Sequence, residues 1–332
     1  MMFGTFAMIG WMAFALCALL LVSQLLTMSD YFDTSGGITE KHHSGTMFAD
    51  DKVAIISVDG VIMSGDGYVK HQIDRVRGDA SVKAIVVRVD SPGGTVTGSD
   101  YIFHHLNKLR EEKGVPLVVS MGSIAASGGY YVSMAVGDQE DSIYAEPTTT
   151  TGSIGVIIPH YDLSGLMARF DVKDDSIASH PRKQMLAMTR PIPEDHRALL
   201  QAYVDESFGR FKAIVKQGRP AFRENEAALD ELATGEIFTA TKAKEAGLVD
   251  EIGFLESAID RALTLANLDA NNTRVVRYLR PASLFDISGF VMSNDRRPDL
   301  ASMLELTSPR AYYLASSMPP LMASYSLLWK EN

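Results

Sequence analysis

Two short segments carry residues whose types and spacing could do chemistry. The first is Asp90-Ser91-Pro92-Gly93-Gly94, directly after the apolar run Ala84 to Val89. Paired glycines allow unusual backbone angles and present N–H groups with no side chain in the way. In an open α/β sheet, ligands bind at the carboxyl ends of the strands, so this segment is a candidate binding loop. A plain Pro-Gly turn would have the same sequence.

The second segment is Gly122-Ser123-Ile124-Ala125-Ala126-Ser127-Gly128-Gly129-Tyr130-Tyr131, after the apolar run Pro116 to Met121. Small residues flank Ser127, so a substrate backbone could approach its hydroxyl. The apolar pattern that follows predicts a helix starting near Ser127, and the positive end of that helix would stabilise developing negative charge. Alternatively, Ser127 serves only as the N-cap of that helix.

The elements that must position these segments follow from the hydrophobic pattern. Short apolar runs predict buried strands at residues 53–58, 84–89, 116–121, 143–145 and 154–158. Amphipathic periodicity predicts helices over residues 102–112, 193–216 and 255–265. Because strands and helices alternate, we expect an α/β fold with a parallel sheet, flanking helices and right-handed crossovers.

Composition excludes several classes of protein. The chain has 332 residues and a net charge of −10, which argues against nucleic acid as the main partner. A hydrophobic content of 46% excludes a disordered chain. The single cysteine, Cys17, excludes an intramolecular disulfide framework. The eight histidines show no metal-binding spacing and no phosphate loop occurs, so we expect no metal and no cofactor.

The chain divides into four parts by pattern. Residues 3–28 carry no charge and would span about 39 Å as a helix, so we expect residues 1–28 to be an uncleaved transmembrane anchor. A cleaved signal peptide fits less well, because no basic residue precedes the apolar stretch. Residues 29–50, which include His42-His43, are polar and predict a flexible linker. Residues 51–268 form the expected folded domain, and residues 269–332 a C-terminal extension of unassigned role.

Together these segments resemble the signal peptide peptidase A family of membrane serine proteases, which share the Clp protease and crotonase fold. The resemblance covers residues 52–268, with a matching anchor in front. The matching stretches are Arg88 to Gly94, Met121 to Tyr131, Thr151-Gly152-Ser153-Ile154-Gly155-Val156 and Gly247-Leu248-Val249-Asp250. One departure is Gly137 to Asp141, which looks like a small insertion between the second and third stretches.

The resemblance implies a role for particular residues. Ser127 matches the nucleophile of the family, and Lys183 falls where the family has its general-base lysine. Ser153 matches the serine that orients this lysine. The backbone N–H groups of Gly128 and of the pair Gly93-Gly94 match the oxyanion hole. No cofactor is implied.

A Ser-Lys pair needs a particular environment. A serine hydroxyl is a weak nucleophile and needs an adjacent base. Lysine has a free pKa of about 10.4, and desolvation must bring it to about 7 to 8 before it can act as that base. We therefore expect Lys183 in a closed groove rather than as a solvated charge beside Arg182 and Arg190. A histidine base, His160 or His180, is the rival, although neither lies in a matching stretch.

The resemblance implies a membrane-anchored serine endopeptidase that degrades residual signal peptides and similar apolar peptides. It implies a single-pass protein of the cell membrane, with membrane lipid around the anchor and the catalytic domain outside the cytoplasm. It also implies a homo-oligomer, in which Ser127 and Lys183 of one site can come from different copies. Two alternatives stay open: a crotonase-like enzyme acting on acyl-CoA, and a catalytically inactive membrane scaffold that binds apolar segments.

Overall fold

A computed structural model describes residues 11, 37–279 and 312–314 of the chain. Its strands are β1 (Thr39–Gly45), β2 (Asp51–Asp59), β3 (Val82–Ser91), β4 (Gly93–Thr95), β5 (Leu117–Ala126), β6 (Ile143–Ala145), β7 (Thr150–Gly152), β8 (Ile237–Thr239), β9 (Glu251–Ile252), β10 (Thr273–Leu279) and β11 (Tyr312–Leu314). Its α-helices are α2 (Tyr68–Gly78), α3 (Val96–Lys113), α4 (Gly128–Ser133), α5 (Ser164–Arg169), α6 (Glu194–Gly218), α7 (Ala221–Glu224), α8 (Glu226–Leu232), α9 (Ala240–Glu245) and α10 (Leu255–Leu265), and three 3-10 helices are η1 (Met134–Val136), η2 (Pro181–Gln184) and η3 (Ala270–Asn272).

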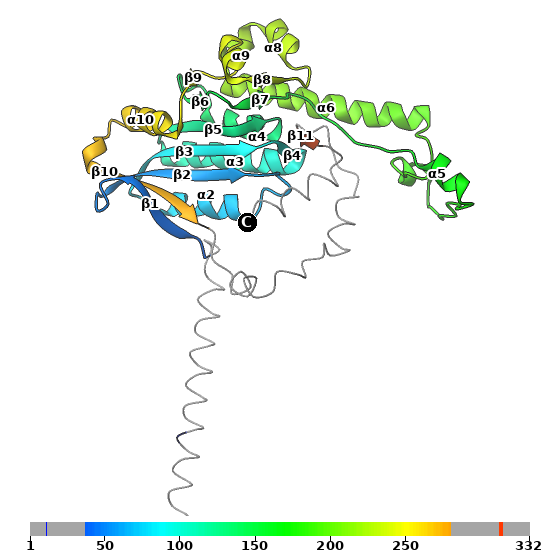
Figure 1. The fold of residues 1–332 in the computed structure, drawn as a ribbon, viewed down its shortest axis with the longest axis horizontal. Helices are drawn as coiled ribbons and strands as arrows, with labels where there is room; N and C mark the ends of the chain where they lie inside the picture. Colours follow the sequence, from blue (N-terminus) through cyan, green and yellow to red (C-terminus); the bar gives the residue numbers. More distant parts are fainter. Residues whose placement is uncertain (1–10, 12–36, 280–311, 315–332) are drawn as a thin grey trace, which may run out of the picture.

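A mostly parallel sheet forms the centre of the fold (Figure 1). Its strand order is β1-β10-β2-β3-β5-β6-β9, and β7 and β8 continue it beside β5. The pairs from β10 through β2, β3 and β5 to β6 are parallel, whereas the edge strand β1 runs antiparallel to β10. This arrangement confirms the expected α/β class with a parallel sheet and flanking helices.

Both faces of the sheet are covered by helices. Because successive side chains of a strand point to opposite faces, each central strand contributes to two cores. On β2, Ala54 and Ile56 belong to the large core under α2, α3 and α4. Their neighbours Val53 and Ile55 belong to a smaller core under α10. A strand buried on both faces has an apolar side chain at nearly every position, which explains the apolar run at residues 53–58, interrupted only by Ser57.

Most of the predicted elements are confirmed. The strands expected at 53–58, 84–89, 116–121 and 143–145 are β2, β3, β5 and β6, and the helix expected at 255–265 is α10. The helices expected at 102–112 and 193–216 correspond to α3 and α6. The strand expected at 154–158 is wrong: the strand in this region is β7, which ends at Gly152 and pairs with β5 and β8.

The folded unit is wider than the expected domain of residues 51–268. The structure places β1 inside the range expected to be a linker, and β10 inside the expected C-terminal extension. These two strands pair with each other, and β10 also pairs in parallel with β2. The sequence pattern did not predict either strand, because β1 is polar throughout and β10 mixes charged and apolar residues irregularly, so backbone pairing rather than an apolar run defines them.

The expected anchor at residues 1–28 lies outside the described residues, apart from Trp11. Within the described ranges, no helix combines the length and the apolar content that a membrane span needs.

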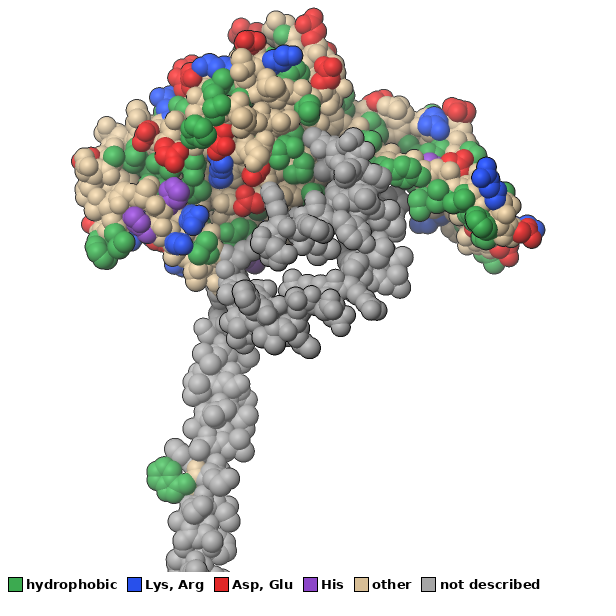
Figure 2. Space-filling view, in the orientation of Figure 1, with side chains coloured by type: hydrophobic (Ala, Val, Ile, Leu, Met, Phe, Trp, Pro, Cys, Tyr) green, Lys and Arg blue, Asp and Glu red, His purple; other side chains and the backbone are tan. Residues whose placement is uncertain are grey.

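The segment of residues 156–192, which we call the arm, connects β7 to α6. Figure 1 shows it reaching away from the sheet, with α5 near its far end. Neither α5 nor η2 contains a buried residue. Hydrophobic side chains show on this part of the surface in Figure 2, and the large exposed ones in the arm are Ile157, Tyr161, Leu163, Leu166, Phe170, Val172, Ile177 and Met188. The arm therefore has no core of its own.

Candidate active site

Two neighbouring strand ends bring the glycine and serine segments together. The strands β3 and β5 are parallel, and Ser91 at the end of β3 lies opposite Ala125 near the end of β5. Ser127 follows β5 directly, and the short strand β4 begins at Gly93. Both segments therefore lie at the carboxyl edge of the sheet, where α/β proteins place their ligands.

Ser127 occupies a sharp turn between strand β5 and helix α4. Its backbone angles are φ 53° and ψ −115°, a region that side-chain-bearing residues rarely adopt. Its N–H donates to the carbonyl oxygen of Gly152 at 2.8 Å, and its own carbonyl accepts from the N–H of Tyr131 at 2.8 Å. A serine held on a strained strand-to-helix turn is the arrangement that presents a nucleophile in many hydrolases. The residue is 1% exposed.

The glycine backbones pack directly against this turn. A Cβ atom on Gly128 would lie 2.4 Å from Ser99 Oγ and 3.2 Å from the backbone nitrogen of Gly94. A Cβ atom on Gly93 would lie 2.6 Å from the backbone nitrogen of Gly128. The three glycines matched to the oxyanion hole are thus in contact, and no other residue type fits at these positions.

Only two of these three N–H groups suit an oxyanion. The N–H of Gly93 donates to Ser91 Oγ at 3.1 Å, within the loop itself. This bond favours Gly94 and Gly128 as the pair of donors, and Gly128 is the residue that follows Ser127. An oxyanion hole commonly combines the N–H after the nucleophile with one from a neighbouring loop.

Ser153 is brought next to Ser127 by strand pairing. It follows β7, and β7 runs parallel to β5 with Gly152 opposite Ala126. Its φ is 52°, and its N–H donates to the carbonyl oxygen of Glu236 at 2.6 Å. The side chain of Thr151 donates to the carbonyl oxygen of Ala125 at 2.7 Å and ties the two strands further. Two serines from different motifs therefore sit on adjacent strand ends.

Lys183 does not join them within one chain. It lies in η2 on the arm, and its side chain is exposed. Among the described residues, its ammonium group has no hydrogen bond and no ion pair. Sequence reasoning expected a closed groove around this lysine, and the single chain does not provide one, because the arm reaches away from the sheet (Figure 1).

The two rival histidines also lie on the arm. The Nε2 atom of His160 contacts the carbonyl oxygen of Ala187 at 3.2 Å. The Nδ1 atom of His180 accepts the N–H of Arg182 at 3.1 Å, which caps η2. Both have local structural partners, and neither is paired with Ser127.

Comparison with known proteins now decides the family. The sequence model of "Peptidase family S49" matches residues 109–269, which include Ser127, Ser153 and Lys183. The protein "Putative protease slr0021" of Synechocystis is 38% identical over 224 residues, which cover 68% of this chain and 78% of that protein. The chain belongs to peptidase family S49. This membership confirms the resemblance to the signal peptide peptidase A family.

Two further relatives carry longer chains. "Protease 4" of Salmonella typhi is 35% identical over 65% of this S49 chain, and "Serine protease SPPA, chloroplastic" of Arabidopsis thaliana is 32% identical over 78% of it. The aligned region spans only 35% and 39% of those two proteins, respectively. A solved structure of a point mutant of the "1510-N membrane-bound stomatin-specific protease" is similar with a TM-score of 0.43 and 18% identity, over 71% of this chain and all of that one.

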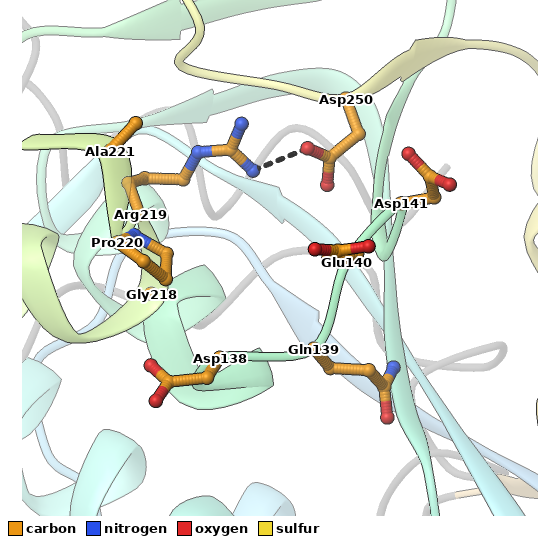
Figure 3. A pocket seen from close by; sticks show the side chains of 9 residues that line it. All are labelled: Asp138, Gln139, Glu140, Asp141, Gly218, Arg219, Pro220, Ala221 and Asp250. Carbon is orange, nitrogen blue, oxygen red and sulfur yellow. Dashed lines mark hydrogen bonds and ion pairs between the residues drawn. The ribbon is translucent and has the colours of Figure 1, made fainter.

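A pocket of about 440 Å³ lies at the opposite edge of the sheet of this S49 peptidase, where β6 begins (Figure 3). It is lined by residues 138–141, 218–221 and 250. Arg219 donates to Asp250 Oδ1 at 2.6 Å, and Asp250 Oδ2 accepts the N–H groups of Ser142 and Ile143 at 2.9 Å each. These bonds fasten Ser142 and Ile143, directly after residues 137–141, to Asp250 and Arg219, so the pocket lies at a structural junction. In the described part of the chain, no three His, Cys, Asp or Glu side chains gather as a metal site needs.

Sequence reasoning missed one part of this site. The strand β11 pairs with β4, although residues 269–332 had no assigned role. The signal that could have found it is the short aromatic run Tyr312-Tyr313-Leu314, since aromatic residues favour strands.

Proposed function

We propose that this S49 peptidase is a membrane-anchored serine endopeptidase with Ser127 as its nucleophile. The observation that carries the proposal is the strained turn at Ser127, packed against the backbones of Gly94 and Gly128. A fold of the Clp and crotonase type belongs to the same proposal. The substrates are residual signal peptides and similar apolar peptides, as the name of the family suggests.

The reaction follows from these positions. Ser127 Oγ attacks a peptide carbonyl while Lys183 Nζ takes its proton. The N–H groups of Gly94 and Gly128 hold the oxyanion, and Ser153 positions the amine of Lys183. The proton then passes to the leaving amine, and an acyl group stays on Ser127. Water hydrolyses this ester with the lysine again acting as base.

Lys183 reaches Ser127 of a second copy in this proposal. Its own arm carries it away from its own serine, and the apolar side chains of the arm lack a core. Exposed apolar surface of this extent is typical of protein interfaces. Packing the arm against a neighbouring copy would bury these side chains and desolvate the lysine. We therefore propose a closed homo-oligomer, anchored in the cell membrane by residues 1–28 with the catalytic domain outside the cytoplasm.

The test is peptide cleavage by the full chain in detergent, against a labelled apolar signal-peptide sequence. Ser127→Ala and Lys183→Ala should each lose at least a hundredfold in kcat/KM, with folding and oligomer size unchanged. The matched control is Lys173→Ala, since Lys173 is also exposed on the arm and, in the part of the chain that the structure describes, pairs only with Asp171. Cleavage that survives Ser127→Ala would overturn the serine mechanism. Cleavage that is lost in Ser127→Ala but retained in Lys183→Ala would overturn the role of Lys183 as the base.

A further inference from the structure

Strand β5 contains a bulge just before the turn of the proposed nucleophile. Val89 of β3 lies opposite Met121 of β5. Two residues later, Ser91 lies opposite Ala125, so β5 advances four residues where β3 advances two. The bulge also divides β5 between two partners, because β5 pairs with β6 up to Met121 and with β7 from Ile124 onward. Bulges are frequent next to active sites, where they re-aim a side chain.

This bulge decides where Ser127 lies along the edge of the sheet. Without the two extra residues, even pairing would place Ser123 opposite Ser91. Ser127 would then lie two residues further along the strand, a shift of about 7 Å at about 3.3 Å per residue. The glycine loop continues directly from Ser91, so this shift would carry Ser127 away from the N–H group of Gly94. The contact between the serine turn and the glycines therefore depends on the bulge.

The carboxylate of Asp90 holds the bulge from the side of β3. A bulge takes backbone groups out of the strand ladder, and these groups need other partners. The N–H of Ile124 donates to Asp90 Oδ1 at 3.2 Å, and the hydroxyl of Ser123 donates to Asp90 Oδ2 at 3.4 Å. The backbone of Asp90 is held as well, because its carbonyl oxygen accepts the N–H of Gly60 at 2.9 Å. Asp90 thus joins the ends of three strands, β2, β3 and β5.

A second group holds the bulge from the side of β6 and β7. The hydroxyl of the buried Thr149 donates to the carbonyl oxygen of Gly122 at 2.6 Å. A Cβ atom on Gly122 would lie 3.1 Å from Asp90 Cγ and 3.1 Å from Arg88 Nη2, so both side chains pack closely on this glycine. Arg88 is paired with Glu146 at 2.5 Å. Among the described residues, Asp90 forms no ion pair, and its carboxylate serves as a hydrogen-bond acceptor for the bulge.

We propose that Asp90 is a positioning residue for the cleavage reaction, because its carboxylate fixes the bulge that sets Ser127 beside the oxyanion donors. Asp90 acts through the backbone of β5 and not on the reacting atoms. The inference rests on the proposed function, since it takes Ser127 as the nucleophile. A displacement of about 1 Å at a reacting group can cost about a hundredfold in rate. Loss of the acceptor should therefore lower kcat and leave KM nearly unchanged.

The first experiment measures kcat and KM of the full chain in detergent with a labelled apolar signal-peptide sequence. Asp90→Ala should lower kcat at least tenfold and leave KM within threefold of wild type. Asp90→Asn keeps an oxygen that accepts the N–H of Ile124, so both constants should stay within threefold of wild type. A normal kcat in Asp90→Ala overturns the positioning role. An Asp90→Asn enzyme as slow as Asp90→Ala overturns it too, because the acceptor would then not be what matters.

The matched control for the lost carboxylate is Asp260→Ala. Asp260 is exposed on α10, and its carboxylate makes no hydrogen bond or ion pair with the described residues. Both constants should equal those of wild type.

Thr149 provides an independent variant if Asp90→Ala does not fold. Thr149→Val keeps the shape of the side chain but removes the hydroxyl that binds Gly122, whereas Thr149→Ser keeps the hydroxyl. Loosening the bulge from this side should lower kcat at least threefold without raising KM, and the serine variant should match wild type. A Thr149→Val enzyme with the kcat of wild type shows that the bulge does not position Ser127, and it overturns the inference.

Hydrogen exchange separates failure of this inference from failure of the proposed function. Exchange over residues 121–126 is followed by mass spectrometry in the full chain carrying Ser127→Ala, with and without Asp90→Ala. The double variant should exchange at least tenfold faster in this segment, with exchange in α3 unchanged. This result supports the role of Asp90 in holding the bulge even if wild type cleaves no peptide. Equal exchange by both folded proteins overturns that role, while cleavage by wild type would leave the protease assignment intact.

Discussion

The N–H of Ser127 donates a 2.8 Å hydrogen bond to the carbonyl oxygen of Gly152, the residue before Ser153. One backbone bond thus joins the turn of the proposed nucleophile to the strand end of the proposed positioning serine. Both serines have positive φ, at 53° and 52°. Strain at two adjacent strand ends is the kind of cost that proteins retain at functional sites.

The strain at Ser127 predicts that two inactive variants differ in stability. Glycine adopts a positive φ without a side-chain clash, so Ser127→Gly should be more stable than Ser127→Ala by about 1 kcal/mol. Both variants should be inactive, because neither has a hydroxyl. Urea unfolding of the two variants measures the difference. Equal stability would mean that the turn is not strained.

The contact between Gly128 and Ser99 predicts that Gly128→Ala is damaging. Ser99 Oγ donates to the carbonyl oxygen of Thr95 at 3.0 Å, so it is held in place and cannot give way to a methyl group 2.4 Å distant. We expect a loss of about 2 kcal/mol of stability, in the range of overpacked cores, and loss of cleavage.

Gly209→Ala is the matched control for that change. Gly209 lies within α6, and nothing lies within 4 Å of a Cβ atom there. Its replacement should add about 0.5 to 1 kcal/mol of stability, the difference in helix propensity, and leave activity unchanged. Thermal unfolding and peptide cleavage of both variants provide the comparison. A Gly128→Ala enzyme as stable and active as wild type would contradict the packing described at the site.

If each active site combines Ser127 of one copy with Lys183 of another, two variants that are inactive alone should recover activity when mixed. Ser127→Ala and Lys183→Ala copies, unfolded and refolded together in equal amounts, should regain up to about a quarter of wild-type cleavage, because each interface needs one intact serine and one intact lysine. Each variant mixed instead with the double variant Ser127→Ala/Lys183→Ala should stay inactive. No recovery in mixed oligomers, verified by mass, would place both residues in one copy.

The lowered pKa of Asp79 predicts that part of the protein's stability is lost at acid pH. Burial raises the pKa of its carboxyl, but hydrogen bonds from Lys52 and Ser81 outweigh burial and lower the pKa from 3.8 to about 2. A depressed carboxyl pKa stabilises the fold above the unfolded pKa, and this contribution disappears as the pH falls through the folded pKa. The stability gap between wild type and Asp79→Asn should thus be largest above about pH 4 and close toward about pH 2.

Urea unfolding across that pH range tests the role of Asp79. The matched control is Glu245→Gln, since Glu245 is exposed on α9 and makes no hydrogen bond or ion pair with the described residues. The difference in stability between Glu245→Gln and wild type should stay small at every pH. A gap for Asp79→Asn that does not change with pH would show that the Lys52 contact does not stabilise the fold.

Local pattern was enough to predict the central strands of the sheet. The apolar runs of β2, β3 and β5 are buried on both faces, and α10 has one apolar side, so each element is defined by its own residues. By contrast, β1 has the polar sequence Thr39-Glu40-Lys41-His42-His43-Ser44-Gly45, and only pairing with β10 makes it a strand. Backbone pairing with a distant segment does not require alternating apolar and polar side chains, so an edge strand such as β1 need not show a periodic sequence pattern.

The sequence by itself determined that Ser127 is surrounded by small residues after a buried strand, and that glycines follow the neighbouring strand, since a turn and its glycines are local properties. Only the tertiary structure decided which segments meet. It put Ser153 beside Ser127, placed Lys183 out on the arm and laid Tyr313 against Gly93. These relations depend on contacts between residues far apart in the chain, whose free energy comes from shared burial and backbone pairing that no single segment contains.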